Sequence, residues 1–259
     1  MLVKNFTNHL TGLSGRLNFS TAMKALASVF LFGVLAVTSI SYAADITGTI
    51  TLTGTPPAEV TIQPLLDDPT CGSLHKDTPT THFYAVGKNG EFADVVVSLK
   101  DATGNAITGK STGSSAPAAV IDQAGCLYTP QILAIQTGQT ITVKNSDPCV
   151  HNVHTTSAAG NTEHNDVQMP NGADLNYTFD KPEMFMKFQC DVHRWMFAWV
   201  SVFDSPYYSI SGADGKFVIK NVPPGKYTIV ADHRKLGEKT QTVEVTDKDV
   251  TVNFSFEVK

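Results

Sequence analysis

The sequence predicts an all-β protein built from β-sandwiches. Short runs of alternating polar and apolar residues recur along the chain, and β-branched and aromatic residues dominate them. Clusters of Gly, Pro, Asn and Asp separate these runs at close spacing. After residue 43 no segment repeats its apolar residues with the period of a helix, so sandwiches or barrels are the expected architecture.

The N-terminal residues 1–43 have the pattern of a secretory signal peptide. Three basic residues precede the uncharged apolar run 25–40, and the sequence Ser-Tyr-Ala ends at Ala43, after which we expect cleavage. The alternative is a permanent anchor, but the run is shorter than the roughly 20 residues that a spanning helix needs. We therefore expect a periplasmic or otherwise exported protein, with no stable membrane insertion after cleavage.

The charge of the chain limits its partners. The formal net charge is −5, and removal of the three basic residues in 1–43 would make it −8. An acidic surface disfavours binding to nucleic acid and to anionic membranes. It permits a basic protein partner without requiring one.

Most of the expected strands follow from alternation between turn residues. Residues 131–147 are predicted to form two strands around Thr137-Gly138, and the small polar stretches 104–119 and 157–166 are predicted to be loops. The other expected strands lie within 46–54, 92–101, 174–182, 184–190, 197–203, 216–222, 226–233, 241–246 and 249–258.

One predicted loop carries three residue types that bind metals. The stretch FQCDVHRWMFAWVSV places Cys190, His193 and Met196 at Cys-x2-His-x2-Met spacing, and His151 lies upstream after a predicted strand. Two imidazoles, a thiolate and a thioether form a soft ligand set that selects copper. A trigonal His2Cys site with a weak axial Met is typical of electron transfer, so we predict one type 1 copper ion.

Residues 118–203 resemble the cupredoxins, the small blue copper proteins. The resemblance rests on TITVKNSDPCVHNVH, a strand and turn followed by His-Asn-Val, and on YTFDKPEMFMKFQC, an aromatic strand that ends at the cysteine. The short spacing of the ligand loop is similar to that of amicyanin. The resemblance implies a Greek-key sandwich with His151, Cys190, His193 and Met196 as copper ligands. It also implies that Asn152, or alternatively Asn145, supports the site through hydrogen bonds.

Cys149 leaves an alternative ligand set open. It lies two positions before His151, and residues i and i+2 share a face of an extended strand. With Cys190 and both histidines it would complete a Cys2His2 set, which suits zinc. We favour Cys149 as a small buried residue, because Pro148 and the turn at Asp147 disturb a regular strand here.

The remaining cysteines predict one disulfide. An exported chain lies where disulfides persist, and four cysteines allow two bridges. If Cys190 binds metal, only one bridge can form. We expect it between Cys71 and Cys126, which lie next to glycines outside the metal motif.

The segment 213–233 resembles the carboxypeptidase-regulatory-like, or transthyretin-like, β-sandwich. It reads ADGKFVIKNVPPGKYTIVADH, with a glycine turn, alternating residues and a Pro-Pro-Gly corner. Strands typical of the start of that family occur before the copper segment. The cupredoxin at 118–203 would then be inserted into a sandwich split between 45–104 and 204–259, or the sandwiches would stand in tandem.

These observations favour an electron carrier over an enzyme. A copper enzyme, such as a nitrite reductase or an oxidase, needs a further site with several histidines, and the remaining histidines are scattered. We expect a redox protein partner, with electrons crossing an exposed edge of His193 near Trp195 and Phe197. The alternative is a copper or zinc module for binding or delivery, with a structural or docking sandwich.

Overall fold

The structure is a computed structural model that describes residues 42–258. The predicted signal, up to residue 41, lies outside the described residues. Within 42–258 no helix has the length and apolar character needed to cross a membrane. The described chain consists almost wholly of strands, which confirms the all-β prediction.

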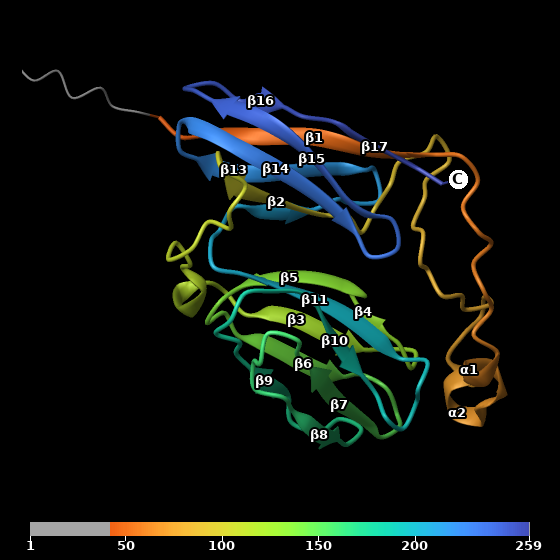
Figure 1. Cartoon of the computed structure of the whole chain (residues 1–259). Helices are drawn as coiled ribbons and strands as arrows, with labels where there is room; N and C mark the ends of the chain where they lie inside the picture. The colour runs from red at the N-terminus through yellow and green to blue at the C-terminus, as the bar shows by residue number, and fades with distance from the viewer. Residues whose placement is uncertain (1–41, 259) are drawn as a thin grey trace, which may run out of the picture. The chain divides into compact units, whose positions relative to one another are not determined.

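One sheet joins strands from both ends of the described chain, and a second sheet lies with it. β1 (Ala44–Thr53) lies between β13 (Lys216–Val222) and β16 (Val250–Thr251), and it also pairs with β17 (Phe254–Glu257). In Figure 1 the orange β1 therefore lies among the blue C-terminal strands. The other sheet has the order β12 (Tyr208–Ile210), β2 (Val96–Asp101), β14 (Gly225–His233) and β15 (Gly237–Val245).

These two sheets enclose one hydrophobic core. Alternate residues of β1 point inward, and Ile46 and Ile50 are fully buried against Phe217, Ile219 and Phe254. The period-2 alternation seen in the sequence therefore faces this core. β1 and β2 precede residues 118–203, but they pair with strands that follow that segment.

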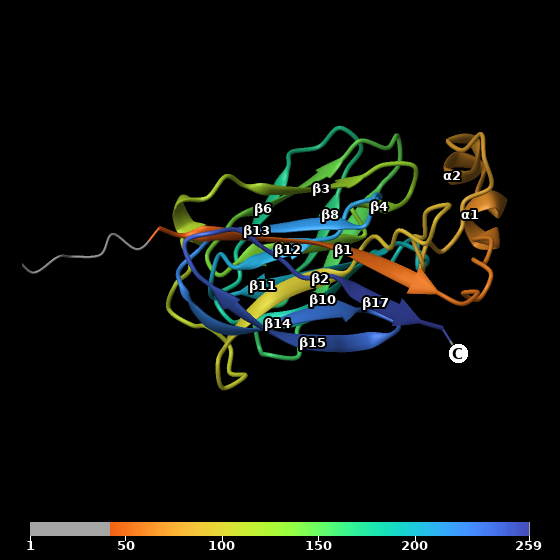
Figure 2. The same ribbon diagram turned by 90° about the horizontal axis from the view of Figure 1, so that it is seen from above.

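The middle of the chain forms two further sheets around a second core. Figure 2 shows β3 and β6 of one of these sheets side by side. This core is lined by residues such as Val143, Val153, Phe188 and Val200. One sheet has the order β5 (Ile132–Gln136), β11 (Phe197–Phe203), β10 (Glu183–Gln189), β7 (His151–Thr156) and β8 (Asn165–Gln168). The other has the order β4 (Tyr128–Thr129), β3 (Ala119–Gln123), β6 (Ile141–Asn145) and β9 (Leu175–Tyr177).

Two short helices, α1 (Gln63–Asp67) and α2 (Pro69–Ser73), were not predicted from the sequence. Each has only five residues, which is too short for a helical period to show. The Asp68 carboxylate caps α2 by accepting the backbone N–H groups of Thr70 and Cys71. Leu65 and Cys71 are buried in the core formed by the middle of the chain, which is described above as the second core. The helical segment therefore packs on that sandwich.

Some predicted strands differ in extent from the observed ones. Residues 249–258 were expected to form one strand, but they form β16 and β17. Asn253 lies between them, and its side-chain oxygen accepts the backbone N–H of Thr49 at 2.8 Å. This contact replaces a backbone pairing with β1 and divides the strand. Residues 113–115, in a predicted loop, form a single turn of 3-10 helix, Gly113–Ser115.

Candidate metal centre

The loop between β10 and β11 holds three of the predicted ligands in a compact turn. The backbone N–H of Cys190 donates to the carbonyl of Met196 at 3.2 Å, and the N–H of Met196 donates to the carbonyl of His193 at 2.8 Å. The N–H of His193 donates to the Cys190 sulfur at 3.4 Å. These bonds hold the two ends of the loop together, so its side chains are positioned by the backbone.

His151 reaches this loop because of strand pairing. It is the first residue of β7, and β7 runs antiparallel to β10, with His154 opposite Gln189. The start of β7 therefore lies beside the end of β10, where Cys190 follows. The His151 side chain is completely buried there.

Three of the predicted ligands converge at one point. One ligand atom each from His151, Cys190 and His193 lies within 4.8 Å of the others. The Nδ1 atoms of the two histidines are 2.9 Å apart, and the Cys190 Sγ lies 3.9 Å from Nδ1 of His193. Met196, the predicted axial ligand, is fully buried in the same core.

This geometry fits a copper ion. Two nitrogens at about 2.0 Å from one ion lie roughly 3 to 3.5 Å apart, and a sulfur at about 2.3 Å lies roughly 3.5 to 4 Å from each nitrogen. The observed 3.9 Å between sulfur and nitrogen lies in this range, and the 2.9 Å between the two nitrogens is slightly shorter. The donor set, two imidazoles and one thiolate with a thioether nearby, is the set that copper prefers.

The surroundings of Cys190 favour its thiolate. Burial alone would raise the pKa of Cys190, but contacts from His151 and from the backbone N–H groups of Asn152 and His193 outweigh it and lower the pKa below its usual value. The N–H of Asn152 lies 3.4 Å from the sulfur. The deprotonated sulfur is the form that binds metal.

The two histidines differ in charge environment. Burial lowers the pKa of His193, and the neighbouring His151 lowers it further. Burial also opposes protonation of His151, but the carboxylate of Asp147 and the sulfur of Cys190 raise its pKa above the usual value. His193 is therefore the more easily neutral of the two.

Both predicted supporting asparagines brace the site. The side-chain oxygen of Asn152 accepts the backbone N–H of Asp191, directly after Cys190, and its amide donates to Asn165 at 2.6 Å. The amide of Asn145 donates to the carbonyl of Cys149 at 3.0 Å. Asn152 thus ties β7 to the ligand loop, whereas Asn145 holds the turn before His151.

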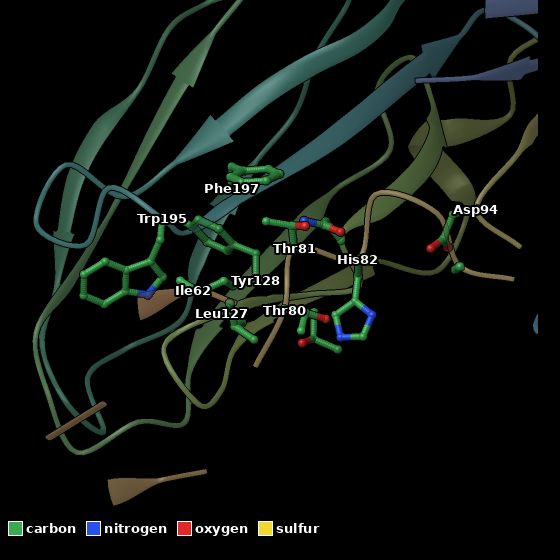
Figure 3. Close-up of a pocket in the computed structure, with 12 residues that line it drawn as sticks. Ile62, Thr80, Thr81, His82, Asp94, Leu127, Tyr128, Trp195 and Phe197 are labelled. Carbon is green, nitrogen blue, oxygen red and sulfur yellow. The ribbon is translucent and has the colours of Figure 1, made fainter. Parts of the chain in front are cut away.

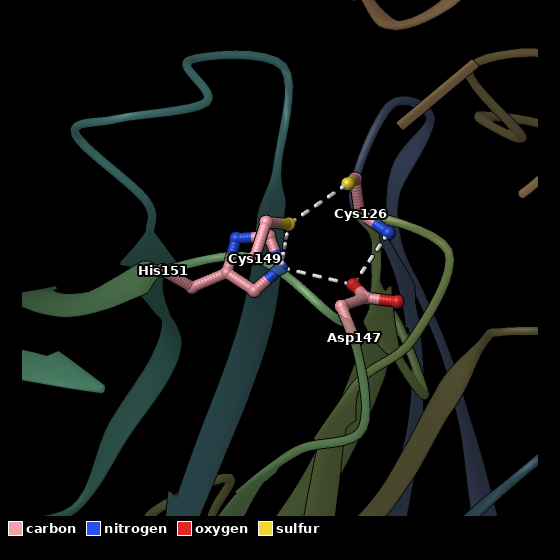
Figure 4. A group of neighbouring side chains, drawn as sticks. All are labelled: Cys126, Asp147, Cys149 and His151. Carbon is pink, nitrogen blue, oxygen red and sulfur yellow. Dashed lines mark hydrogen bonds and ion pairs between the residues drawn. The ribbon is translucent and has the colours of Figure 1, made fainter. Parts of the chain in front are cut away.

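Asp147 is a residue of the site that the sequence reading did not single out (Figure 4). Its carboxylate lies 2.9 Å from Nε2 of His151, and both groups are buried. In the sequence Asp147 was interpreted only as part of a turn. No spacing rule marks such a contact, because the turn at Ser146–Pro148 determines where the carboxylate points.

Cys149 does not join the group around Cys190. Its sulfur lies 3.6 Å from Nε2 of His151, whereas Nδ1 of His151 faces His193. One imidazole presents its two nitrogens in different directions, so these contacts lie on different sides of the ring. Cys149 is partly buried, and its sulfur is 3.7 Å from that of Cys126. This placement favours the interpretation of Cys149 as a neighbour of the site.

The disulfide predicted between Cys71 and Cys126 is present. Its S–S distance is 2.07 Å, and both residues are fully buried. Cys149 and Cys190 are the free cysteines of residues 42–258. The bridge attaches the α1–α2 segment to the loop at Cys126, beside the metal site.

The expected exposed edge of His193 is wrong. Only 8% of His193 is accessible, and its ring packs against Trp195 with 5.1 Å between ring centroids. The α1–α2 segment, held by the disulfide, lies close enough for Asp68 to influence the charge of His193. Trp195 and Phe197 instead line a pocket of about 480 Å³ with Tyr128 (Figure 3). The indole N–H of Trp195 donates to the carbonyl of Cys126 at 3.1 Å.

Comparison with known families bears on the two parts of the chain separately. Residues 117–203 match the family described as copper binding proteins, plastocyanin/azurin family. The resemblance to the cupredoxins is confirmed for this segment. Residues 207–259 match the second beta sandwich domain of BOS complex subunit NOMO1-like proteins, in agreement with a β-sandwich there.

Solved structures similar to the chain include several cupredoxins. A purple cupredoxin from Nitrosopumilus maritimus is 26% identical, with 32% of this chain and 98% of that chain covered and a TM-score of 0.28. An amicyanin mutant in its Cu(I) form is 19% identical, with 41% and 97% covered and a TM-score of 0.30.

A copper-containing nitrite reductase from Thermus scotoductus SA-01 is also similar. It is 20% identical, with 34% of this chain covered and a TM-score of 0.31. The chain spans only 22% of the length of that reductase. No curated protein sequence matches the chain.

Proposed function

We propose that this protein is an exported carrier of single electrons that holds one type 1 copper ion at His151, Cys190, His193 and Met196. The observation that carries the proposal is the convergence of one nitrogen from each of His151 and His193 and the Cys190 sulfur within 4.8 Å of one another. When bound, copper supplies one-electron redox chemistry at a potential set by its ligands. Redox partners are expected to be proteins, and the acidic chain permits a partner with a basic surface.

The protein's own residues support this role by holding the ligands still. His151 and Cys190 are anchored on neighbouring strands, and the ligand loop is closed by backbone hydrogen bonds. All three strong ligands are buried, so water is largely excluded from the site. Ligands that move little between oxidation states keep the reorganisation energy of electron transfer low.

The proposal favours a carrier over an enzyme and over a delivery module. The candidate ligand groups in residues 42–258 overlap around His151, His193 and Cys149, so they support one ion. A delivery module would draw on Cys149 as a ligand. The position of Cys149 beside Nε2 of His151 supports the carrier instead.

Metal loading and spectroscopy test this function. Purified protein loaded with copper is expected to bind one ion per chain and to show an intense visible thiolate-to-copper band. Cys190→Ser should abolish the band, whereas Cys149→Ala should retain both the band and the copper content. Absence of the band in the wild type would refute the carrier, and loss of copper in Cys149→Ala would favour the delivery module.

Export is tested separately by localisation. We expect the chain to accumulate outside the cytoplasm and to begin at Ala44 after processing. N-terminal sequencing of the secreted protein checks this. A protein that stays in the cytoplasm at full length would contradict export without contradicting the copper site.

A further inference from the structure

The Asp147 carboxylate is held on three sides by protein groups. Its Oδ1 accepts the backbone N–H of Gly125 at 2.6 Å, and its Oδ2 accepts that of Cys126 at 2.7 Å. The same Oδ2 lies 2.9 Å from Nε2 of His151. With 3% of the residue exposed, these contacts replace water around a buried carboxylate.

The backbone at Gly125 and Cys126 is shaped to bind an anion. Both residues have positive φ angles, 66° and 54°. Successive N–H groups in such a conformation can point to one side and form a concave anion site. A left-handed conformation is uncommon for a residue other than glycine, so Cys126 adopts it at some cost. The two N–H groups donate hydrogen bonds to the Asp147 carboxylate and so fix its position.

The two backbone N–H groups that bind Asp147 lie next to the disulfide. Cys126 contributes one of the two N–H groups and is bonded through its sulfur to Cys71. A continuous series of contacts thus runs from the disulfide through the Gly125–Cys126 backbone and Asp147 to His151. Figure 4 shows its part from Cys126 through Asp147 to His151. Each step is a covalent bond or a buried hydrogen bond.

The contact with Asp147 determines how His151 faces the site. A carboxylate accepts a hydrogen bond, so Nε2 of His151 carries the proton. Nδ1 then keeps its lone pair, and Nδ1 is the atom that lies 2.9 Å from Nδ1 of His193. Carboxylates that hold the second nitrogen of a histidine ligand fix its tautomer and ring orientation.

We infer that Asp147 is a positioning residue for the metal site, which fixes the Nε2–H tautomer of His151 and couples that ligand to the Cys71–Cys126 disulfide. The inference rests on the proposed copper site for its effect on metal affinity. The tautomer itself is a property of the metal-free chain, so it can be tested independently of copper.

The first experiment measures the tautomer in metal-free protein. At a pH high enough for the imidazole of His151 to be neutral, nitrogen-15 NMR is expected to show it protonated at Nε2 in the wild type, and a changed or mixed tautomer in Asp147→Asn. Asp166→Asn is the matched control, because Asp166 contacts His164 and Tyr177 on another part of the sandwich. An unchanged His151 tautomer in Asp147→Asn would overturn the inference.

The second experiment measures copper affinity by competition with a Cu(I) chelator. Loss of a partner of this kind typically weakens metal binding about 10–100-fold, so we expect that range for Asp147→Asn and no change for Asp166→Asn. Equal affinity of Asp147→Asn and the wild type would overturn the inferred effect on metal binding. If the wild type binds no copper, the proposed function fails, while the tautomer result still decides the role of Asp147.

A third experiment removes the disulfide with Cys71→Ala combined with Cys126→Ala and leaves Asp147 in place. We expect this variant to shift the His151 signals and copper affinity in the same direction as Asp147→Asn. The variant that combines Asp147→Asn with both cysteine substitutions should lose less copper affinity than the sum of the two separate losses, because coupled groups are non-additive. Full additivity would overturn the coupling to the disulfide. Should Asp147→Asn not fold, the disulfide variant with the same two measurements decides the inference.

Discussion

His151 and His193 present their Nδ1 atoms to each other at 2.9 Å, although they lie 42 positions apart in the chain. One belongs to the start of β7 and the other to the loop after β10. Two buried imidazole nitrogens at this distance can share a proton in a hydrogen bond or bind one cation together. The predictions below test the residues around this pair.

Met196 should act as an axial ligand as well as a core residue. Met196→Leu keeps the volume of this fully buried side chain, so we expect a loss of less than about 1.5 kcal/mol in the free energy of unfolding. Removal of the thioether should change the reduction potential while the visible band remains. Voltammetry of the copper-loaded variant checks this; an unchanged potential would show that Met196 only packs the core.

Asn152 should stabilise the ligand loop. Asn152→Ala removes the acceptor of the Asp191 N–H and the donor to Asn165, so we expect a loss of roughly 1–3 kcal/mol in metal-free protein. Urea unfolding measures it. Asn176→Ala is the control, because Asn176 makes an exposed contact with Thr142 and should change stability much less. Equal effects of both variants would argue against a special role for Asn152.

The disulfide should contribute strongly to stability. It joins residues 55 positions apart, and the chain-entropy model assigns such a loop about 4 kcal/mol. Cys71→Ser combined with Cys126→Ser should lower the free energy of unfolding by about that amount in urea titrations. Cys149→Ser serves as the control with an intact bridge. A double variant as stable as this control would contradict the prediction.

His233 should make the sandwich that contains β1, β2 and β14 sensitive to acid. It is 3% exposed and packs against Phe92 and Phe256, and burial lowers the pKa of His233 from 6.5 to about 4. The unfolded chain therefore binds a proton more readily than the folded chain, so stability is complete above pH 6.5 and falls as the pH drops toward 4. The full effect is on the order of 3 kcal/mol.

Urea titrations between pH 7 and pH 4 measure this dependence. His233→Gln removes the titrating group, so its stability should fall less with acid over the same range. His75→Gln is a comparison that keeps the buried His233; its ring lies at 2.6 Å from the Gly125 carbonyl in a different part of the chain. A slope in His233→Gln equal to that of the wild type would show that other groups cause the acid sensitivity.

Much of the fold could be predicted because it follows from local patterns. Alternation in 46–54, 131–147 and 197–203 marks strands, since each buries one face on a core. The pairing of β1 with β13 and β17 could not be predicted with certainty, because strand partners more than 160 residues apart leave no local signal. The helices α1 and α2 were missed for lack of length.

The sequence by itself determined the candidate ligand types, the spacing of Cys190, His193 and Met196, and the expected cysteine pair, because chemistry and short loops can be read along a chain. Only the tertiary structure decided which ring nitrogens face each other, that His193 is buried, and that Asp147 contacts His151. Those features depend on how separate strands meet, and the direction of a side chain at such a meeting point is set by packing in three dimensions.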